Sequence, residues 1–382
     1  MSSETTNRSG ALAGVRVIEI GGVGPGPFAG MLLADQGAEV IRIERAADAG
    51  KPSGHPVIHR GRRSIALDLK DPASVEAVLK IVESSDALIE GFRPGVAERL
   101  GLGPEICLER NPRLVYGRMT GFGQTGPSAN LPGHDINYIA VTGALGAMGK
   151  AGENPPVPLN LVGDMGGGGI LLAFGLTTAM LHARTSGQGQ VVDAAMVDGT
   201  AAQLSLLLGL RKVGRWFDER GVNAFDGGAP YYNTYRTADG KFMAVGSVEP
   251  QFWACVKDVL GLSDEPLFAE QLDRAAWPKM IARMSEVFAT RTRDEWAAAF
   301  DGKDSCVTPV FDIVEAANQP QNTERATYYE EDGMIQPSPA PRFLGTPAAH
   351  PAPAPVIGAH THEVLTELGL DAETVERLAP RA

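Results

Sequence analysis

Three residues of this sequence combine a side chain that can carry a proton with neighbours that can aim it. His134 follows Gly133, Asp164 lies shortly before four consecutive glycines, and Glu249 precedes Pro250. Imidazoles and carboxylates are the usual general acids and bases, and glycines allow the backbone turns that direct them into a cavity. We therefore expect His134 and Asp164 to form the chemical centre of the chain.

Each of these residues also has a purely structural interpretation. A single histidine such as His134 is more often a satisfied core or surface residue than a catalytic group. Asp164 fits the N-cap of the apolar helix predicted after it, where its carboxylate would accept free N–H groups. A helix start would also offer N–H groups to a developing oxyanion, and we expect those donors just after Asp164. Glu249 fits another N-cap, or a carboxylate that orients an imidazole.

The elements that must position these residues alternate between strands and helices. Residues 15–20 form a β-branched run, a turn rich in glycine and proline follows, and a helix leads to a second run at 39–43. This is the order of a parallel βαβ unit. Further strands are predicted at 64–67, 87–90, 114–119 and 190–195. The fold class is therefore α/β.

Basic residues gather near the predicted strand ends. A cluster covers residues 59–63, and Arg45, Arg93 and Arg99 follow other strands. In an acidic protein such a cluster is either a solvated face or an anion site. Open α/β sheets bind ligands at the carboxyl ends of their strands. We expect an anionic ligand that is held by local arginines.

The turn after the first strand resembles a dinucleotide fingerprint. Gly24-x-Gly26-x-x-Ala29 fits the pattern G-x-G-x-x-G/A, and Glu44 stands near the place of the usual acidic residue. However, Pro25 and Pro27 remove N–H groups that a pyrophosphate would need. A nicotinamide cofactor is therefore the weaker interpretation.

Composition excludes several classes of protein. The 382 residues carry a net charge of -12, which argues against a nucleic-acid surface. The three cysteines lie far apart without a Cys-x-x-Cys pair, so neither a disulfide framework nor a metal site is expected, and a reducing cytoplasm is predicted. The first ten residues lack the apolar run of a secretory signal. Residues 165–183 approach the length of a membrane span, but their glycines and threonines favour a buried core helix without a membrane partner.

The chain is predicted to contain two domains. We place a large domain at 1–210, a linker at 211–228, a smaller domain at 229–330 and a C-terminal strap at 331–382 that returns over the large domain. The smaller domain begins with a hairpin whose turn contains Asp239-Gly240, a pair that accommodates positive φ. The tail is rich in proline, which is typical of an extended segment.

Seven motifs, taken in order, resemble one family. They are VGPGPF (23–28), ALDLK (66–70), EGFRPG (90–95), RMTGFGQ (118–124), GHDINY (133–138), NLVGD (160–164) and GSVEPQF (246–252). Together they resemble the alpha-methylacyl-CoA racemases of the class III CoA-transferase superfamily, over about residues 12–343. The resemblance implies a Rossmann-like large domain that binds CoA without a nicotinamide, a smaller α+β domain, and an interlocked homodimer.

The resemblance also implies roles for individual residues. His134 and Asp164 would be the two bases of a 1,1-proton transfer that inverts the α-carbon of a 2-methyl-branched acyl-CoA through an enolate, and Glu249 would orient His134. CoA would be part of the substrate, with no separate cofactor. The residues implied to bind the substrate are Arg45, Leu67, Asp68, Leu69, Lys70, Gly91, Phe92, Arg93, Arg99, Gly133, His134, Asp135, Ile136, Asn137 and Tyr138.

Two other functions remain as alternatives. A CoA-transferase of the same superfamily would use Asp164 as a nucleophile that forms an acyl anhydride. His134 and Glu249 together favour the racemase, because the transferase needs neither. A non-catalytic protein that binds CoA esters is the third possibility.

Overall fold

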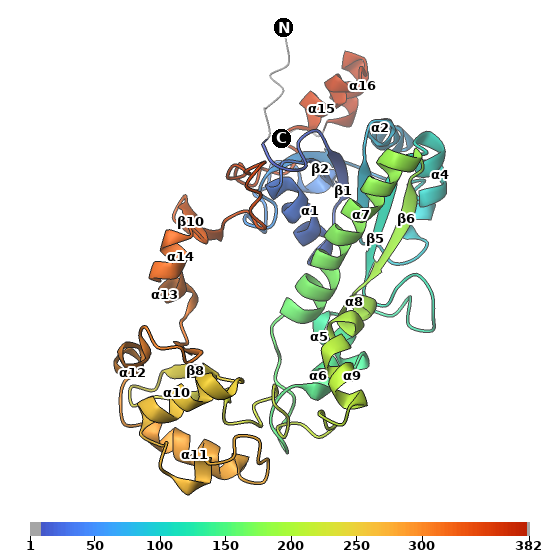
Figure 1. Ribbon diagram of the computed structural model, residues 1–382. Coiled ribbons are helices and arrows are strands. Elements are labelled where there is room, and N and C mark those ends of the chain that lie inside the picture. The colour runs from blue at the N-terminus through green and yellow to red at the C-terminus, as the bar shows by residue number, and fades with distance from the viewer. Residues whose placement is uncertain (1–8, 380–382) are drawn as a thin grey trace. The chain divides into compact units, whose positions relative to one another are not determined.

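The computed structural model describes residues 9–379, which form two compact units (Figure 1). The larger unit consists of the described residues up to 142, residues 158–203, and the described residues from 329 on. The smaller unit consists of residues 143–157 and 204–328. It therefore includes residues 211–228, which were predicted as a linker, and residues 143–157, which lie between two parts of the larger unit.

The larger unit is built on six parallel strands in the spatial order β3-β2-β1-β4-β5-β6. The strands are β1 (Arg16–Ile20), β2 (Glu39–Arg45), β3 (Arg62–Leu67), β4 (Ala87–Glu90), β5 (Val115–Thr120) and β6 (Gln190–Ala195). The α/β class predicted from the alternating pattern is confirmed. The strand order reverses between β1 and β4, and such a reversal opens a crevice at the carboxyl ends of the two strands.

Helices cover both faces of this sheet. One apolar cluster joins the sheet to α2 (Pro72–Glu83) and α4 (Pro104–Arg110), and another joins it to α1 (Pro25–Asp35) and α7 (Leu171–Ser186). The remaining short elements here are the 3-10 helix η1 (Ala46–Asp48), α3 (Val96–Arg99), α5 (Asp135–Val141) and α8 (Met196–Gln203). Asp198 lies in the first turn of α8.

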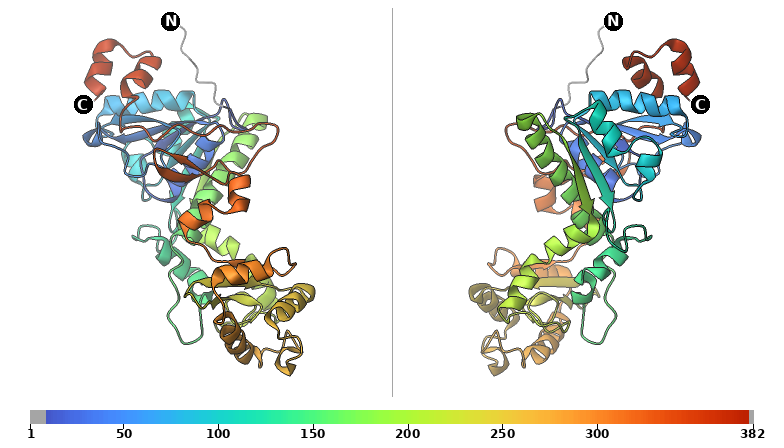
Figure 2. Two further views of the ribbon diagram at one scale, coloured as in Figure 1. Left: turned by 90° about the vertical axis from the view of Figure 1, so that its left-hand side faces the viewer. Right: turned by 90° about the vertical axis from the view of Figure 1, so that its right-hand side faces the viewer.

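The C-terminal segment returns to the larger unit. It forms the hairpin β10 (Tyr328–Glu331) and β11 (Met334–Pro337), then an extended stretch, then α15 (Thr361–Glu367) and α16 (Ala372–Leu378). The Gly61 N–H donates to the Ala352 carbonyl at 2.8 Å, and the Gly50 N–H donates to the Ile357 carbonyl at 3.0 Å. Helix α15 packs against β3, so the chain end completes the apolar cluster on that face (Figure 2).

The smaller unit has its own core around a three-stranded antiparallel sheet, β7-β8-β9. Its strands are β7 (Tyr232–Arg236), β8 (Phe242–Gly246) and β9 (Val307–Pro309). Its helices are α6 (Ala144–Ala147), α9 (Ser205–Lys212), α10 (Pro250–Leu260), the 3-10 helix η3 (Pro266–Phe268), α11 (Trp277–Phe288), α12 (Arg293–Phe300), α13 (Ile313–Ala317) and α14 (Pro320–Glu324). The hairpin predicted around Asp239-Gly240 is confirmed by the antiparallel pairing of β7 with β8.

The apolar helix differs from its prediction. It begins as the π-helix η2 (Leu161–Ile170) and continues as α7. By length and composition, η2 and α7 together could cross a membrane. Of their most apolar stretch of 18 residues, 39% is buried within the protein. Leu172 and Leu176 enter the core, whereas Ile170, Phe174 and Leu181 are exposed. The expectation of a helix buried on all sides is therefore met on one face only.

Candidate active site

The predicted substrate-binding residues follow the carboxyl ends of neighbouring strands. Arg45 ends β2, Leu67 ends β3, and Gly91, Phe92 and Arg93 follow β4. Sheet order places these ends on one edge, on both sides of the point where the strand order reverses. The sequence-predicted groups therefore share the edge where this architecture binds ligands.

The side chains at this edge differ in exposure. Arg45, Arg93 and Arg99 are exposed, and none of them forms an ion pair within 4.0 Å among residues 9–379. The Leu67 side chain is 1% exposed and belongs to the core. Because its side chain is buried, Leu67 can face a ligand with its backbone alone. The neighbouring Asp68 and Lys70 are exposed and can face a ligand with their side chains.

Asp164 lies beside the glycine turn that follows β1. It occupies the first turn of the π-helix η2, whose N-cap is Asn160, so the predicted N-cap role of Asp164 is wrong. A Cβ atom on Gly24 would lie 3.3 Å from Asp164 Oδ2. The Asn160 amide donates to the same oxygen at 3.3 Å. The turn that resembled a dinucleotide fingerprint thus serves as one wall for this carboxylate.

The glycines after Asp164 permit close packing. A Cβ atom on Gly167 would lie 2.8 Å from Thr200 Oγ1, and one on Gly168 would lie 2.8 Å from Pro25 Cβ. Glycine is therefore required for η2 to approach α8 and the start of α1. The expectation of free N–H groups after Asp164 is wrong at the next residue, because the Met165 N–H donates to the Asn160 carbonyl at 3.3 Å.

His134 is exposed at the N-cap of α5. Its backbone N–H donates to Asn137 Oδ1 at 3.0 Å, so Asn137 holds the turn that carries the imidazole. The Tyr138 hydroxyl donates to the Gly133 carbonyl. A Cβ atom on Gly133 would lie 2.7 Å from the Tyr138 ring, which explains why glycine precedes the histidine. The side chains of Asn137 and Tyr138 thus support this turn from within α5.

The pKa of Asp164 reflects the charges and hydrogen bonds around it, including the charge on His134. Burial raises the pKa of Asp164, the Asn160 amide lowers it, the Asp135 carboxylate raises it and the charge on His134 lowers it, with a net shift upward. The pKa of Tyr138 is raised by burial and by the nearby Asp164 charge, while Arg93 opposes that shift. The larger unit therefore brings His134, Asp164, Tyr138 and Arg93 into one electrostatic neighbourhood.

Two residues at this site have roles that the sequence did not reveal. The buried carboxylate of Asp135 accepts the backbone N–H groups of Gly163 and Asp164. Asn160 supports Asp164 from the N-cap of η2, four positions earlier in the chain. No local signal indicated this contact, because the helix was predicted to begin only after Asp164.

Glu249 belongs to the smaller unit. It is exposed at the N-cap of α10, and the first turn of that helix begins with Pro250. Its charge contributes, after burial, to a raised pKa of the exposed Cys306 thiol. The structure thus supplies Glu249 as an accessible carboxylate on a surface of that unit.

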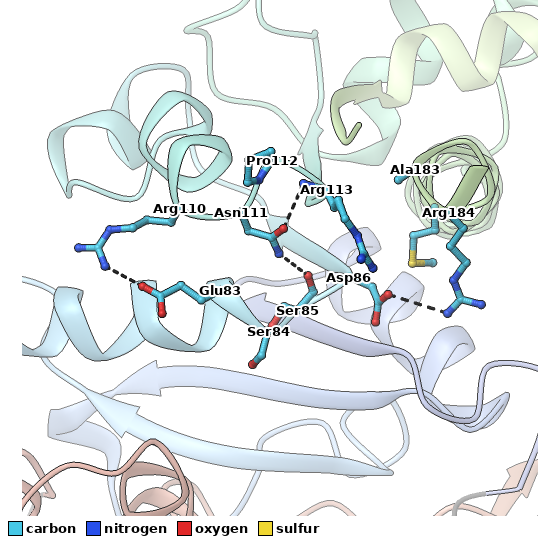
Figure 3. Close-up of a pocket in the computed structure, with 11 residues that line it drawn as sticks. Glu83, Ser84, Ser85, Asp86, Arg110, Asn111, Pro112, Arg113, Ala183 and Arg184 are labelled. Carbon is cyan, nitrogen blue, oxygen red and sulfur yellow. Dashed lines mark hydrogen bonds and ion pairs between the residues drawn. The ribbon is translucent and has the colours of Figure 1, made fainter. Parts of the chain in front are cut away.

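A cavity of about 390 Å³ lies at the opposite edge of the parallel sheet. It is lined by residues at the amino ends of β4 and β5 and by the end of α7 (Figure 3). Arg110 pairs with Glu83 at 2.8 Å and Arg184 approaches Asp86 at 3.9 Å. Because the proton carriers lie at the other edge of the sheet, this cavity is a poor candidate for the substrate site.

A family model and curated relatives relate this chain to one family of proteins, and a solved structure shares its fold. A family model described as CoA-transferase family III matches residues 12–361. The chain is 47% identical over 369 residues to the alpha-methylacyl-CoA racemase of Mus musculus, and 45% identical over 370 residues to that of Homo sapiens, covering 96% of each chain in both cases. A crystal structure of a CAIB/BAIF family protein from Brucella suis shares the fold, with a TM-score of 0.82 at 23% identity, over 94% of this chain and 100% of that one.

Proposed function

The chain belongs to CoA-transferase family III, and from that membership we propose that it is an isomerase that inverts the α-carbon of 2-methyl-branched acyl-CoA thioesters. Near-full-length identity of 45–47% to alpha-methylacyl-CoA racemases supports this function. The structural observation that carries it is the placement of an imidazole and a carboxyl of raised pKa in one electrostatic neighbourhood.

Inversion next to a thioester needs one group to remove a proton and another to return one. In one direction the Asp164 carboxylate takes the α-hydrogen, an enolate forms, and protonated His134 delivers a proton to the other face. In the reverse direction neutral His134 is the base and protonated Asp164 is the acid. A carboxyl whose pKa is raised suits both roles, because general acid–base catalysis is most effective when the pKa approaches the working pH.

The anionic part of the substrate would be met at the strand ends. Arg45, Arg93 and Arg99 are exposed cations without a carboxylate partner among the described residues, so they are available to the phosphates of CoA. Gly91 would contribute a backbone group beside them, whereas the Phe92 N–H already donates to Glu90 at 2.7 Å. Ile136 is exposed next to His134 and would contact the thioester or the acyl chain.

Glu249 and the oligomeric state complete the proposal. We propose that Glu249 orients the His134 imidazole and that the enzyme is a homodimer. Exposed apolar side chains on η2 and α7, among them Leu161, Ile170 and Phe174, support the dimer, since a second copy would remove them from water. Analytical ultracentrifugation tests the dimer, and the activity of Glu249→Gln tests the orienting role.

The experiment that tests the reaction uses a single stereoisomer of a 2-methylacyl-CoA in deuterated water. Wild-type protein should incorporate deuterium at the α-carbon while it racemises the substrate. His134→Gln and Asp164→Asn should each lose at least about 100-fold in racemisation, because each removes one proton carrier. His362→Gln and Asp264→Asn, at exposed positions elsewhere, are matched controls that should retain activity.

Full racemisation by both site variants would refute the two-base mechanism. The transferase alternative is tested by adding a free carboxylic acid to an acyl-CoA. Rapid transfer of CoA to that acid without loss of α-hydrogen would assign Asp164 as a nucleophile instead. Binding of the CoA ester without exchange or transfer would identify a non-catalytic protein.

A further inference from the structure

Asp135 is a buried acid that makes its hydrogen bonds to the backbone of the site. Its side chain is largely enclosed, at 5% exposure. Oδ2 accepts the Gly163 N–H at 2.7 Å and the Asp164 N–H at 2.6 Å. Hydrogen bonds to an ionised acceptor are among the stronger ones in proteins, so this contact fixes the backbone that carries Asp164.

The contact also completes the start of the π-helix. The first N–H groups of any helix have no partner within that helix. Gly163 and Asp164 lie at the third and fourth positions of η2, and Asn160 at its N-cap makes no side-chain cap bond. Asp135 therefore caps η2 from another helix, α5. A Cβ atom on Gly163 would lie 2.7 Å from Asp135 Oδ2, so only glycine admits this approach.

The charge of Asp135 is not neutralised by a side chain. Its second oxygen, Oδ1, is buried and has no hydrogen-bond partner among residues 9–379. The negative charge thus acts on its surroundings, and the nearest ionisable group along the same contact is Asp164. Among the influences that raise the pKa of Asp164, burial comes first and the charge of Asp135 second.

The other groups that face Asp164 are few. From α5 come the opposing charge of His134 and the hydroxyl of Tyr138, and from the N-cap of η2 comes the Asn160 amide. Helix α1 approaches η2 with Pro25 and Phe28, and α8 approaches it with Thr200 and Gln203, none of which titrates. The one acidic residue of α8, Asp198, is exposed.

We propose that Asp135 is a positioning residue for the proton transfer: its buried carboxylate holds the backbone of Asp164 in place and sets a negative charge beside it that no side chain neutralises. This inference rests on the proposed function, in which Asp164 both removes and returns a proton. Asp135 itself need not touch the substrate. Its effect is to let the same carboxyl act as an acid in one direction and as a base in the other.

The test compares Asp135→Asn with Asp135→Ala in both directions of the reaction. Asparagine keeps an oxygen that can accept both N–H groups but removes the charge. The pH profile of kcat should then move to lower pH by about one unit in the limb that reports Asp164, with kcat at its optimum changed less than about threefold. Alanine removes the acceptor as well, and kcat should fall about 10-fold or more while KM changes little.

The controls separate this inference from the proposed function. Asp198→Asn removes a nearby exposed charge and should leave the pH profile unchanged. Asp164→Asn should abolish racemisation; if it does not, the proposed function fails and Asp135 has no base to position. If Asp164→Asn is inactive but the profile of Asp135→Asn coincides with that of wild type, the inference about Asp135 alone is refuted. Should Asp135→Ala fail to fold, the pH profile of Asp135→Asn decides.

Discussion

The arginines near the parallel sheet fall into two groups that the sequence does not distinguish. In the first group the guanidinium is buried against a carboxylate. Arg62 pairs with Glu19 at 3.0 Å with both side chains fully enclosed, and Arg60 pairs with Asp35 at 2.6 Å with at most 2% exposure. Arg42 makes a further contact with Glu19. These arginines act inside the fold.

The second group is open to solvent. Arg45, Arg93 and Arg99 are exposed at the carboxyl edge of the sheet or just after it, and they lack carboxylate partners among residues 9–379. A paired arginine has its charge and hydrogen bonds satisfied, whereas an unpaired one retains both for an anion. The difference in burial and pairing therefore separates the arginines that stabilise the fold from those that are available to a CoA ester.

The buried group also supports the site from behind. Arg62 donates to the carbonyl of Pro27, and Arg42 donates to the carbonyl of Gly22 at 3.2 Å. The Gly22 carbonyl belongs to the turn between β1 and α1 whose Gly24 lies against Asp164, and the Pro27 carbonyl belongs to the first turn of α1. Burial alone would raise the pKa of Glu19, but Arg62 and Arg42 outweigh it and lower that pKa.

The largest expected effect comes from breaking a buried pair. Arg62→Met removes one of the two guanidinium groups that pair with the buried Glu19 carboxylate and leaves that charge to Arg42 alone. We expect the free energy of unfolding to fall by about 3 to 5 kcal/mol. Urea unfolding at pH 7 measures it. Arg113→Met, at an exposed arginine, is the matched control and should change stability by less than about 0.5 kcal/mol. The double variant Glu19→Gln with Arg62→Met should recover part of the loss. If Arg62→Met were as stable as wild type, the claim that the buried arginines stabilise the fold would be contradicted.

Glu90 and its arginine partner Arg118 form a case between the two groups, because the carboxylate is buried but its contact with the guanidinium is long. Glu90 is 2% exposed at the end of β4, accepts the Phe92 N–H at 2.7 Å, and lies 3.5 Å from the Arg118 guanidinium. Burial raises its pKa to about 7, and the Phe92 N–H and Arg118 only partly oppose this. Because the pKa is raised, the folded protein binds more protons than the unfolded chain, and stability falls as pH rises through the interval up to about 7.

Glu90→Gln should remove this dependence. Relative to wild type, its stability should rise by about 2 kcal/mol between pH 5 and pH 8, measured by urea unfolding at both values. Glu98→Gln is the control with opposite sign. Although burial alone would raise the pKa of Glu98, its bond to Arg118 lowers that pKa, so the folded protein gains from the ionised form above the ordinary pKa of a glutamate. Parallel curves for Glu90→Gln and wild type would show that Glu90 is ionised throughout.

Much of the large unit was predictable because the signals are local. Each β-branched run became a strand. In the smaller unit, the turn chemistry of Asp239-Gly240 likewise gave a hairpin. The π-helix was not predictable. Four glycines disfavour a helix by their intrinsic propensity, and only close packing against Pro25 and Thr200 makes them necessary.

The site was predictable in residue type but not in arrangement. The cluster at 59–63 was open to interpretation as a solvated face or an anion site, because its partners Glu19 and Asp35 are distant in sequence. The register of β1 against β2 places Glu19 opposite Arg42, and this is a tertiary fact. The resemblance implied that Asp135 binds the substrate, and the sequence did not show that its carboxylate binds the backbone of Asp164. Such contacts depend on how α5 meets η2, which no local pattern encodes.

The smallest expected effect comes from the second group, the exposed arginines, and it appears in the affinity for the substrate. Arg93→Gln removes an exposed cation, so the free energy of unfolding should change by less than about 0.5 kcal/mol. We expect KM for an acyl-CoA to rise about 10-fold, which corresponds to about 1.4 kcal/mol, with kcat nearly unchanged, because a phosphate contact binds ground state and transition state alike. The difference in KM between wild type and variant should shrink as salt is added, since exposed charges are screened. Arg113→Gln removes an exposed arginine at the opposite edge of the sheet and should leave KM unchanged. An equal rise in both variants would mean that net charge, and not a site at the strand ends, attracts the substrate.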